Sequence, residues 1–392
     1  MSEWKEVSLS ELGKTITGKT PSSQYPEDFG DEVPFITPSD SFEKKYISRS
    51  ERYLSRLGSD RLKDKIISSD SIMVTCIGSA MGKVAKNSLP SVTNQQINSI
   101  IVNENFDSDY IYYLFKNNYA VFRNAASGST AIPILNKTDF DNLRFKVELD
   151  LKRQRKMVSI LSKIDDKIEI NNQINQELEA MAKTLYDYWF VQFDFPDQNG
   201  NPYKSSGGKM VYNQELKREI PEGWVVSKVG ELQIATGKRD ANFGTENGKY
   251  DFWTTANSPI KADEFSFEGK AILIAGNGNF YVNFTEGKFE AYQRTYVIQS
   301  EDENMLIFMY MACLQSVEKL RKGSNGSIIK YITIGDVNNI ASPYNKKVVN
   351  EFVRIYSPLI DLISKNKRQN QELTQLRDWL LPMLMNGQVK VE

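Results

Sequence analysis

Residues 157–189 read MVSILSKIDDKIEINNQINQELEAMAKTLYDYW, and residues 352–384 read FVRIYSPLIDLISKNKRQNQELTQLRDWLLPML. Both stretches carry a seam of mostly apolar side chains whose spacing alternates between four and three residues. The first seam consists of Met157, Leu161, Ile164, Ile168, Asn171, Asn175, Leu178, Ala182, Leu185 and Trp189. The second, 195 positions further on, consists of Phe352, Tyr356, Leu359, Ile363, Asn366, Asn370, Leu373, Arg377, Leu380 and Leu384. A mean spacing of 3.5 residues predicts two long helices of the coiled-coil type.

Asparagine interrupts both seams at the same two places, Asn171 and Asn175 in the first and Asn366 and Asn370 in the second. For one seam alone, an amphipathic helix packed on its own domain is the ordinary interpretation. Two matched seams favour pairing with each other, because a buried asparagine is best satisfied by another asparagine and thereby fixes the register. We predict an antiparallel pair with Asn171 opposite Asn370, since a parallel pair would require the intervening chain to span about 50 Å.

The sequence before each stretch is also duplicated, which constrains the architecture before any motif is interpreted. Matching segments are 4–7 and 224–226, 17–19 and 236–238, 94–100 and 292–298, 110–122 and 305–320, 127–130 and 323–327, and 137–140 and 334–337. In each copy the fourth of these is helix-like, and the fifth is a Gly/Ser turn. The runs 71–75 and 270–274 predict strands. Each copy is therefore expected to be a mixed α/β module.

The expected fold class is α+β, with two similar modules at opposite ends of a long antiparallel coiled coil and a pseudo-twofold internal repeat. The predicted segments are a first module at 1–150, a first spacer helix at 151–193, a linker at 194–221, a second module at 222–345, a second spacer helix at 346–386 and a tail at 387–392. Proline and glycine mark the linker. Pro358 and Pro382 predict kinks or frayed ends in the second helix.

The composition excludes several classes of enzyme. The 392 residues include 49 basic and 50 acidic side chains, two cysteines and no histidine. Mechanisms built on Ser-His, Cys-His or His-metal groups are therefore ruled out, and no metal site is expected. Cys76 and Cys313 lie in apolar surroundings, which is typical of buried thiols. No stretch approaches the length of a membrane span, so we expect a cytoplasmic protein with no membrane partner.

Residues 13–20, GKTITGKT, match the phosphate-binding loop pattern G-x-x-x-x-G-K-[ST]. Such a loop needs a buried strand before it and a helix beginning at the Lys-Thr pair. The following residues 21–26, PSSQYP, cannot form that helix, and the second copy has Leu232 and Arg239 at two of the pattern positions. A nucleotide-binding protein is therefore a minor alternative.

Polar loops remain as the candidate site, because their residue types read base edges and contact phosphates in protein–DNA complexes. In the first copy they are Lys19, Thr20, Lys83, Lys86, Asn94, Gln95 and Gln96. In the second they are Lys238, Arg239, Asn257, Asn277, Asn279, Gln293, Arg294, Lys322, Asn325, Lys330 and Tyr331. Residues 1–150 carry 18 basic and 20 acidic side chains, so charge does not favour DNA. Solvated loops on a coiled-coil scaffold with two protein-binding heads are the alternative.

Several segments resemble the specificity subunits of type I restriction-modification systems. They are 154–169 (QRKMVSILSKIDDKIE), 185–191 (LYDYWFV), 221–224 (PEGW), 93–98 (TNQQIN) and the 127–130 turn (SGST). The resemblance covers nearly the whole chain. One departure lies at 148–154, which read ELDLKRQ where the family usually has a Pro-Pro step.

This resemblance implies that each module is a target recognition domain reading one half of a split sequence in double-stranded DNA, and that the helices set the gap. It implies a chain without catalytic residues or cofactors of its own. The implied partners are two modification subunits, which use S-adenosylmethionine to methylate adenine, and restriction subunits, which use ATP and magnesium. The bases that are read and the gap length do not follow from the sequence.

Overall fold

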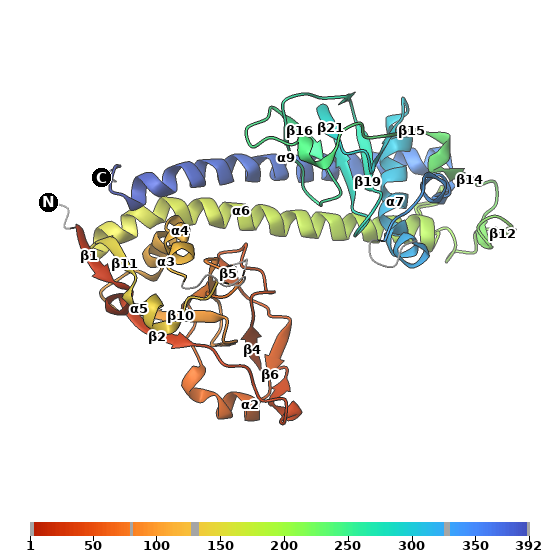
Figure 1. Ribbon diagram of the computed structural model, residues 1–392. Coiled ribbons are helices and arrows are strands. Elements are labelled where there is room, and N and C mark those ends of the chain that lie inside the picture. The colour runs from red at the N-terminus through yellow and green to blue at the C-terminus, as the bar shows by residue number, and fades with distance from the viewer. Residues whose placement is uncertain (1–3, 79–80, 127–132, 325–329, 390–392) are drawn as a thin grey trace. The chain divides into compact units, whose positions relative to one another are not determined.

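The computed structural model describes residues 4–78, 81–126, 133–324 and 330–389. It divides into two compact units (Figure 1). Unit 1 comprises Met1–Asn172 with Lys367–Glu392, and unit 2 comprises Gln173–Asn366. The long helices α6 (Leu151–Tyr186) and α9 (Lys346–Met385) each contribute one part to unit 1 and the other part to unit 2. Each unit therefore consists of one module and two helical segments.

Module 1 opens and closes on paired strands, β1 (Trp4–Ser8) and β11 (Arg144–Glu148), which are antiparallel. A five-stranded sheet has the order β2 (Gly13–Thr17), β10 (Ile97–Val102), β7 (Ile72–Thr75), β8 (Val84–Asn87) and β5 (Tyr46–Ile47). A four-stranded sheet has the order β3 (Phe29–Gly30), β6 (Arg52–Leu54), β4 (Val33–Ile36) and β9 (Val92–Thr93). The α-helices are α1 (Leu9–Leu12), α2 (Arg56–Arg61), α3 (Ser108–Asn117), α4 (Tyr119–Asn124) and α5 (Lys137–Asn142), and the 3₁₀ turns are η1 (Pro26–Asp28) and η2 (Lys63–Lys65).

The central strand β7 shows how the core of module 1 is built. Side chains alternate across a strand, so Ile72 and Val74 face one apolar cluster while Met73 faces another. Helix α3 begins at its N-cap Asp107, whose carboxylate accepts hydrogen bonds from the backbone of the first turn. The apolar stretch 110–122, expected as one helix, is divided between α3 and α4 at Asn118.

Module 2 has a similar plan, as the duplication predicts, although a four-stranded sheet takes the place of the five-stranded sheet of module 1. Its opening strand β14 (Val225–Lys228) pairs with its closing strand β23 (Ala341–Tyr344). One four-stranded sheet has the order β15 (Gln233–Thr236), β22 (Thr295–Gln299), β19 (Ala271–Ala275) and β20 (Val282–Thr285). The other has the order β17 (Ile260–Ala262), β16 (Tyr250–Trp253), β21 (Lys288–Ala291) and β18 (Phe267–Glu268). The helices are α7 (Glu303–Gly323) and α8 (Ile334–Asn338), with 3₁₀ turns η4 (Val229–Glu231) and η5 (Ala241–Phe243).

The helical segments pair within each unit through their asparagines. In unit 1, Asn171 Nδ2 donates to Asn370 Oδ1 at 2.8 Å. In unit 2, Asn366 Nδ2 donates to Asn175 Oδ1 at 2.9 Å. These are the partners that the antiparallel register requires. All seam side chains are buried or half-buried, which is the environment that the 3.5-residue spacing predicts.

The structure adds detail to two expectations, one about the second helix and one about the linker. Helix α9 continues through both Pro358 and Pro382. Residues 194–221 are folded, because β12 (Met210–Asn213) and β13 (Arg218–Pro221) form a hairpin. Phe195 and Ile220 are buried in the core of unit 2, where apolar contacts hold the segment in place. A π-helical turn, η3 (Asp187–Val191), continues α6 toward it.

The two cysteines are buried, as their surroundings predict. Burial raises the pKa of the Cys76 thiol to about 12 and raises the pKa of Cys313 as well, so neither is a ready nucleophile. Within the described part of the chain, no helix is both long and apolar enough to cross a membrane.

Candidate nucleic-acid interface

In module 1 the end of β2 lies against the turn between β9 and β10. The backbone N–H of Lys19 donates to the Thr93 carbonyl at 2.8 Å. Thr20 Oγ1 donates to Gln95 Oε1 at 2.6 Å. The amide of Asn94 donates to Gln96 Oε1 at 3.0 Å. Five predicted residues, Lys19, Thr20, Asn94, Gln95 and Gln96, are thus brought together, and we call them cluster 1.

Module 2 repeats this arrangement at the end of β15. The backbone N–H of Lys238 donates to the Ala291 carbonyl at 3.1 Å, and that of Gln293 donates to the Arg239 carbonyl at 2.9 Å. Lys238, Arg239, Gln293 and the adjacent Arg294 therefore form cluster 2. Clusters 1 and 2 occupy equivalent positions in the two strand plans, since β2 pairs with β10 as β15 pairs with β22.

A glycine makes each of these close approaches feasible. A Cβ added at Gly18 would lie 2.2 Å from the carbonyl oxygens of Thr93 and Asn94. One added at Gly237 would lie 2.2 Å from those of Ala291 and Tyr292. Only a residue without a side chain fits there. At each Thr-Gly-Lys segment the backbone is therefore in close contact with a second backbone segment, residues 93–94 in module 1 and residues 291–292 in module 2.

This geometry excludes a phosphate-binding loop at residues 13–20. Residues 13–17 form strand β2, which pairs with β10. Gly13, the first glycine of the pattern, is therefore part of a β-sheet and not of a loop. The turn η1 is the next helical element after Lys19, and it starts only at Pro26. A phosphate-binding loop would need a helix N-terminus at the lysine.

A third group of predicted residues lies beside cluster 2. Asn277 pairs with Tyr331 in an antiparallel bridge, and the N–H of Gly278 donates to the Lys330 carbonyl at 2.9 Å. The Gly276 N–H donates to the Arg294 carbonyl at 2.7 Å, which connects this group to cluster 2. We call Asn277, Asn279, Lys330 and Tyr331 cluster 3. Module 2 thus presents two adjoining polar groups.

The cations of clusters 1 and 2 differ in how they are held. Lys19 is exposed and has no ion pair among the residues that the structure describes. Lys238 is also exposed, with its ammonium 5.7 Å from the Phe267 ring centroid. Arg239 pairs with Glu264 at 2.6 Å and with the buried Glu290 at 3.3 Å. The two lysines are therefore the free cations, whereas Arg239 is anchored.

Lys86 is not at the surface, contrary to the expectation of a phosphate contact. Its side chain is fully buried, and its ammonium lies 2.6 Å from both Asp70 and Asp109. Burial alone would raise the pKa of Asp109, but Lys86 and Lys45 outweigh it and hold that pKa below its usual range. Lys83 is half-exposed and pairs with Glu43 at 2.6 Å. Neither lysine joins cluster 1.

The other predicted residues lie apart. Asn257 and Lys322 are exposed, and no hydrogen bond or ion pair among the described residues links them to a cluster. Asn325 lies outside the described residues, as do the turn 127–130 and residues 325–327 of its counterpart.

Two residues that the sequence did not predict, Arg321 and Asp240, also contact these clusters. Arg321 donates to the Asn279 carbonyl at 3.4 Å, and Asp240 accepts from Gln293 Nε2 at 2.8 Å. Asp240 directly follows Lys238 and Arg239, so its position beside the repeated segment could have predicted that it joins cluster 2. Arg321 lies on α7, and no sequence pattern predicts its contact. No group of three or more metal-binding side chains occurs within the described ranges.

A family model described as the type I restriction modification DNA specificity domain matches residues 1–180 and 221–375. The chain belongs to this family. It is a specificity subunit of a type I restriction-modification system, the component that confers DNA target recognition. The resemblance found in the sequence is thereby confirmed.

Two relatives illustrate the match. The type I restriction enzyme MjaIX specificity subunit of Methanocaldococcus jannaschii is 28% identical over 422 aligned positions, covering all of this chain and 94% of the relative. The EcoDI specificity subunit of Escherichia coli is 33% identical over 186 positions, covering 44% of this chain and 40% of the relative. The crystal structure of an S subunit from M. genitalium shares the fold, with a TM-score of 0.59, 17% identity and coverage of 98% of this chain and 96% of that one.

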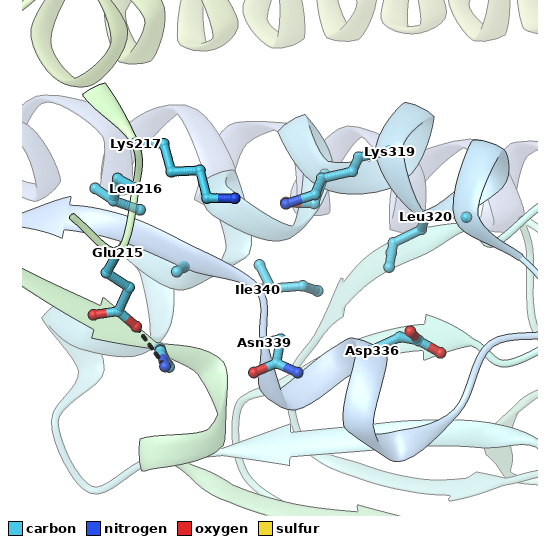
Figure 2. Close-up of a pocket in the computed structure, with 12 residues that line it drawn as sticks. Glu215, Leu216, Lys217, Lys319, Leu320, Asp336, Asn339 and Ile340 are labelled. Atoms are coloured by element: carbon cyan, nitrogen blue, oxygen red, sulfur yellow. Dashed lines mark ion pairs between the residues drawn. The ribbon is translucent and has the colours of Figure 1, made fainter. Parts of the chain in front are cut away.

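Unit 2 of this specificity subunit also contains a pocket of about 620 Å³ (Figure 2). The β12–β13 turn forms one wall with Lys217, and α7 forms another with Lys319. The two ammonium groups point toward each other, and neither lysine has an acidic partner in the described part of the chain. Glu215 pairs with the third lysine, Lys228, at 2.5 Å. The segment predicted as a linker thus shapes the surface of module 2.

Proposed function

We propose that this specificity subunit reads a bipartite target in double-stranded DNA, with each module contacting one half. The observation that carries this proposal is the recurrence of one polar cluster at equivalent places in both modules. Each cluster combines an exposed lysine, which suits phosphate, with amide or guanidinium groups, which suit base edges. Cluster 3 adds further amide groups beside cluster 2. Two modules of similar plan whose clusters carry different side chains favour a target with two half-sites of different sequence.

We further propose that α6 and α9 pair along their whole length as a spacer that holds the modules at opposite ends. The asparagine pair within each unit supports this proposal, because both pairs obey the same antiparallel register. The buried seam supports it as well. On this view the helix length sets the gap between the half-sites.

Exposed apolar residues on the helices support docking of two copies of one partner. In unit 1, Ile160 and Leu376 are 37% and 44% exposed. Their counterparts 195 positions away, Ile355 and Met181, are 43% and 58% exposed in unit 2. Matched apolar positions on charged helices favour two equivalent interfaces. We propose that two methyltransferase subunits bind there.

The remaining chemistry is assigned to partner subunits. We propose that the methyltransferase subunits bring S-adenosylmethionine and modify adenine, and that restriction subunits bring ATP and magnesium. The subunit would act in the cytoplasm without a cofactor of its own. Its near-neutral charge, 49 basic against 50 acidic residues, fits a complex that shares phosphate contacts among several chains.

The test is binding of the full chain with its methyltransferase subunits to a library of random DNA with variable gaps. We expect enrichment of two short motifs at one separation. Lys19→Ala should weaken binding to one half-site, and Lys238→Ala to the other. The exposed Lys63 and Lys249 of the same modules serve as matched controls, and their alanine variants should bind as the unaltered chain does. Enrichment of no sequence would refute the proposal.

A further inference from the structure

Module 1 rests on the helices of unit 1 through a buried polar triad. Tyr113 on α3 donates its hydroxyl proton to Asp165 Oδ2 on α6 at 2.6 Å. Arg377 on α9 donates to the other carboxylate oxygen at 2.8 Å. The side chains of Asp165 and Arg377 are only 11% and 15% exposed. We call Tyr113, Asp165 and Arg377 the polar seat.

A second layer of charge ties the module to α6 beside this seat. Asp109 on α3 accepts hydrogen bonds from Lys45 at 2.8 Å and from Lys86 at 2.6 Å. The Lys45 ammonium also donates to Ser162 Oγ on α6 at 3.1 Å. Charged and hydroxyl groups therefore join module 1 to its helices, in addition to the apolar contacts that Met157, Leu161 and Leu384 make in the core of unit 1.

In unit 2 the positions equivalent to the polar seat are apolar, although Gln315 on α7 donates to Asp187 of η3 at 2.8 Å elsewhere in the same contact. The N-caps Asp107 of α3 and Asp302 of α7 are 195 positions apart, which is also the offset between the two seams. The same offset places Phe308 at the position of Tyr113 and Ile360 at that of Asp165. Ala182, on α6, corresponds to Arg377. All three are buried in the apolar core of unit 2, and we call them the apolar seat.

The two seats exclude each other's modules on physical grounds. Tyr113 placed on the apolar seat would bury a hydroxyl without an acceptor beside Ile360. Phe308 placed on the polar seat would leave one oxygen of Asp165 without its donor. In the unaltered chain the short connections 149–150 and 345 hold each module at the start of its own helix. Once the modules are exchanged in the sequence, the paired terminal strands that both possess allow either backbone at either place. Side chains must discriminate.

We propose that the polar and apolar seats form a pairing code that makes each helical segment specific for the module it carries. This inference rests on the bipartite reading proposed above for its functional consequence, which is the order of the two half-sites along the target. Tyr113, Asp165 and Arg377 are thus positioning residues for recognition, since they orient the module without contacting DNA.

A stability cycle on the full chain tests whether the seat acts as one unit. Asp165→Ile alone and Arg377→Ala alone should each lower the unfolding midpoint by about 5 °C. The first removes the acceptor of the Tyr113 hydroxyl and leaves Arg377 only Asp378, and the second removes the cation beside the largely buried Asp165. The triple variant Tyr113→Phe, Asp165→Ile, Arg377→Ala installs the apolar seat in unit 1. It should unfold within about 2 °C of the unaltered chain. The inference would be overturned if the unfolding midpoint of the triple variant fell by as much as the decreases of the single variants added together.

Exchanging the modules tests the code itself. In a first chain, the unmatched chain, residues 1–150 and residues 222–345 exchange places while α6 and α9 keep their own sequences. A second chain has the same exchange with Asp165→Ile, Arg377→Ala, Ala182→Arg and Ile360→Asp, so that each seat suits its new module. The matched chain should unfold at least about 5 °C above the unmatched one. When methyltransferase subunits are present, the matched chain should also bind DNA in which the order of the two half-sites is reversed. Its affinity for this DNA should be at least tenfold higher than that of the unmatched chain.

Equal midpoints and equal affinities of the two exchanged chains would overturn the pairing code. The two proposals fail in different ways. If the unaltered chain prefers no bipartite DNA, the proposed function fails, while the order of the unfolding midpoints still decides the pairing code. If the unaltered chain prefers bipartite DNA and the exchanged chains behave alike, only the pairing code fails.

Discussion

At the scale of single residues, identical residue types perform different tasks depending on burial. Lys19 and Lys86 both looked like phosphate contacts in the sequence, yet Lys19 is exposed and Lys86 is fully buried. A buried ammonium needs partners, because its hydration is lost. Asp70, Asp109 and Ser108 supply them. Lys86 therefore contributes to the fold of module 1.

Replacing Lys86 should show this difference. Lys86→Met leaves Asp109 partly buried with one cation fewer, so the free energy of unfolding should fall by about 3 kcal/mol. Lys83→Ala is the control, because its pair with Glu43 lies at the surface and should contribute less than about 1 kcal/mol. Urea unfolding of both variants measures the difference. Equal losses would show that burial of Lys86 is not the cause.

The carboxyl group of Asp109, which pairs with Lys86, predicts that the stability of the fold depends on pH. The pKa of Asp109 is lowered in the folded chain, so the folded state favours the charged carboxylate. Its contribution to stability is therefore complete above the unfolded pKa of about 3.9, and it is lost as pH falls through the lowered folded value. In unfolding measured between about pH 2 and pH 6, Asp109→Asn should be less stable than the unaltered chain at the upper end, and the gap should close on acidification. A constant gap would contradict this.

At the scale of elements, the two Thr-Gly-Lys segments show how one motif can be misread when its surroundings are ignored. The letters match a phosphate-binding loop, but the first half of the match is strand β2. The glycine is required because two backbones approach too closely for a side chain. The same close contact between two backbone segments recurs in module 2. The Thr-Gly-Lys motif therefore serves the fold of each module and does not bind a nucleotide.

Alanine at these glycines should be strongly unfavourable. Gly18→Ala and Gly237→Ala each place a methyl group 2.2 Å from carbonyl oxygens, so each should lower stability by about 3 kcal/mol or more. Gly323→Ala is the control, since an added Cβ there has no atom within 4 Å among the described residues. Chemical unfolding monitored by circular dichroism separates these outcomes. A stable Gly18→Ala chain would contradict the close approach.

At the scale of the whole molecule, duplication is the organising feature. Each unit repeats the paired terminal strands, the polar cluster and the asparagine pair, whereas the seats and the folded segment 194–221 break the symmetry. The symmetric parts suit a target with two half-sites and two copies of a partner. The asymmetric parts distinguish unit 1 from unit 2.

Lengthening the spacer tests its proposed role. Inserting one heptad into α6 and one into α9 at matched places preserves the seam and adds about 10 Å at a rise of 1.5 Å per residue. The preferred gap between half-sites should widen by about three base pairs at 3.4 Å each. Selection from a library of gap lengths measures it, with the unaltered chain as reference. An unchanged gap would refute the role of the helices as a ruler.

The residues alone were sufficient to predict the duplication, the helical seams and the asparagine partners, because spacing along a helix or strand directly reflects which side chains are buried. They also indicated clusters 1 and 2 through the matched Thr-Gly-Lys segments. The burial of Lys86, the folded segment 194–221 and the contrast between the two seats appeared only in the tertiary structure. These depend on contacts between side chains far apart in the chain, such as Tyr113 with Asp165 and Arg377, and no local pattern encodes such contacts.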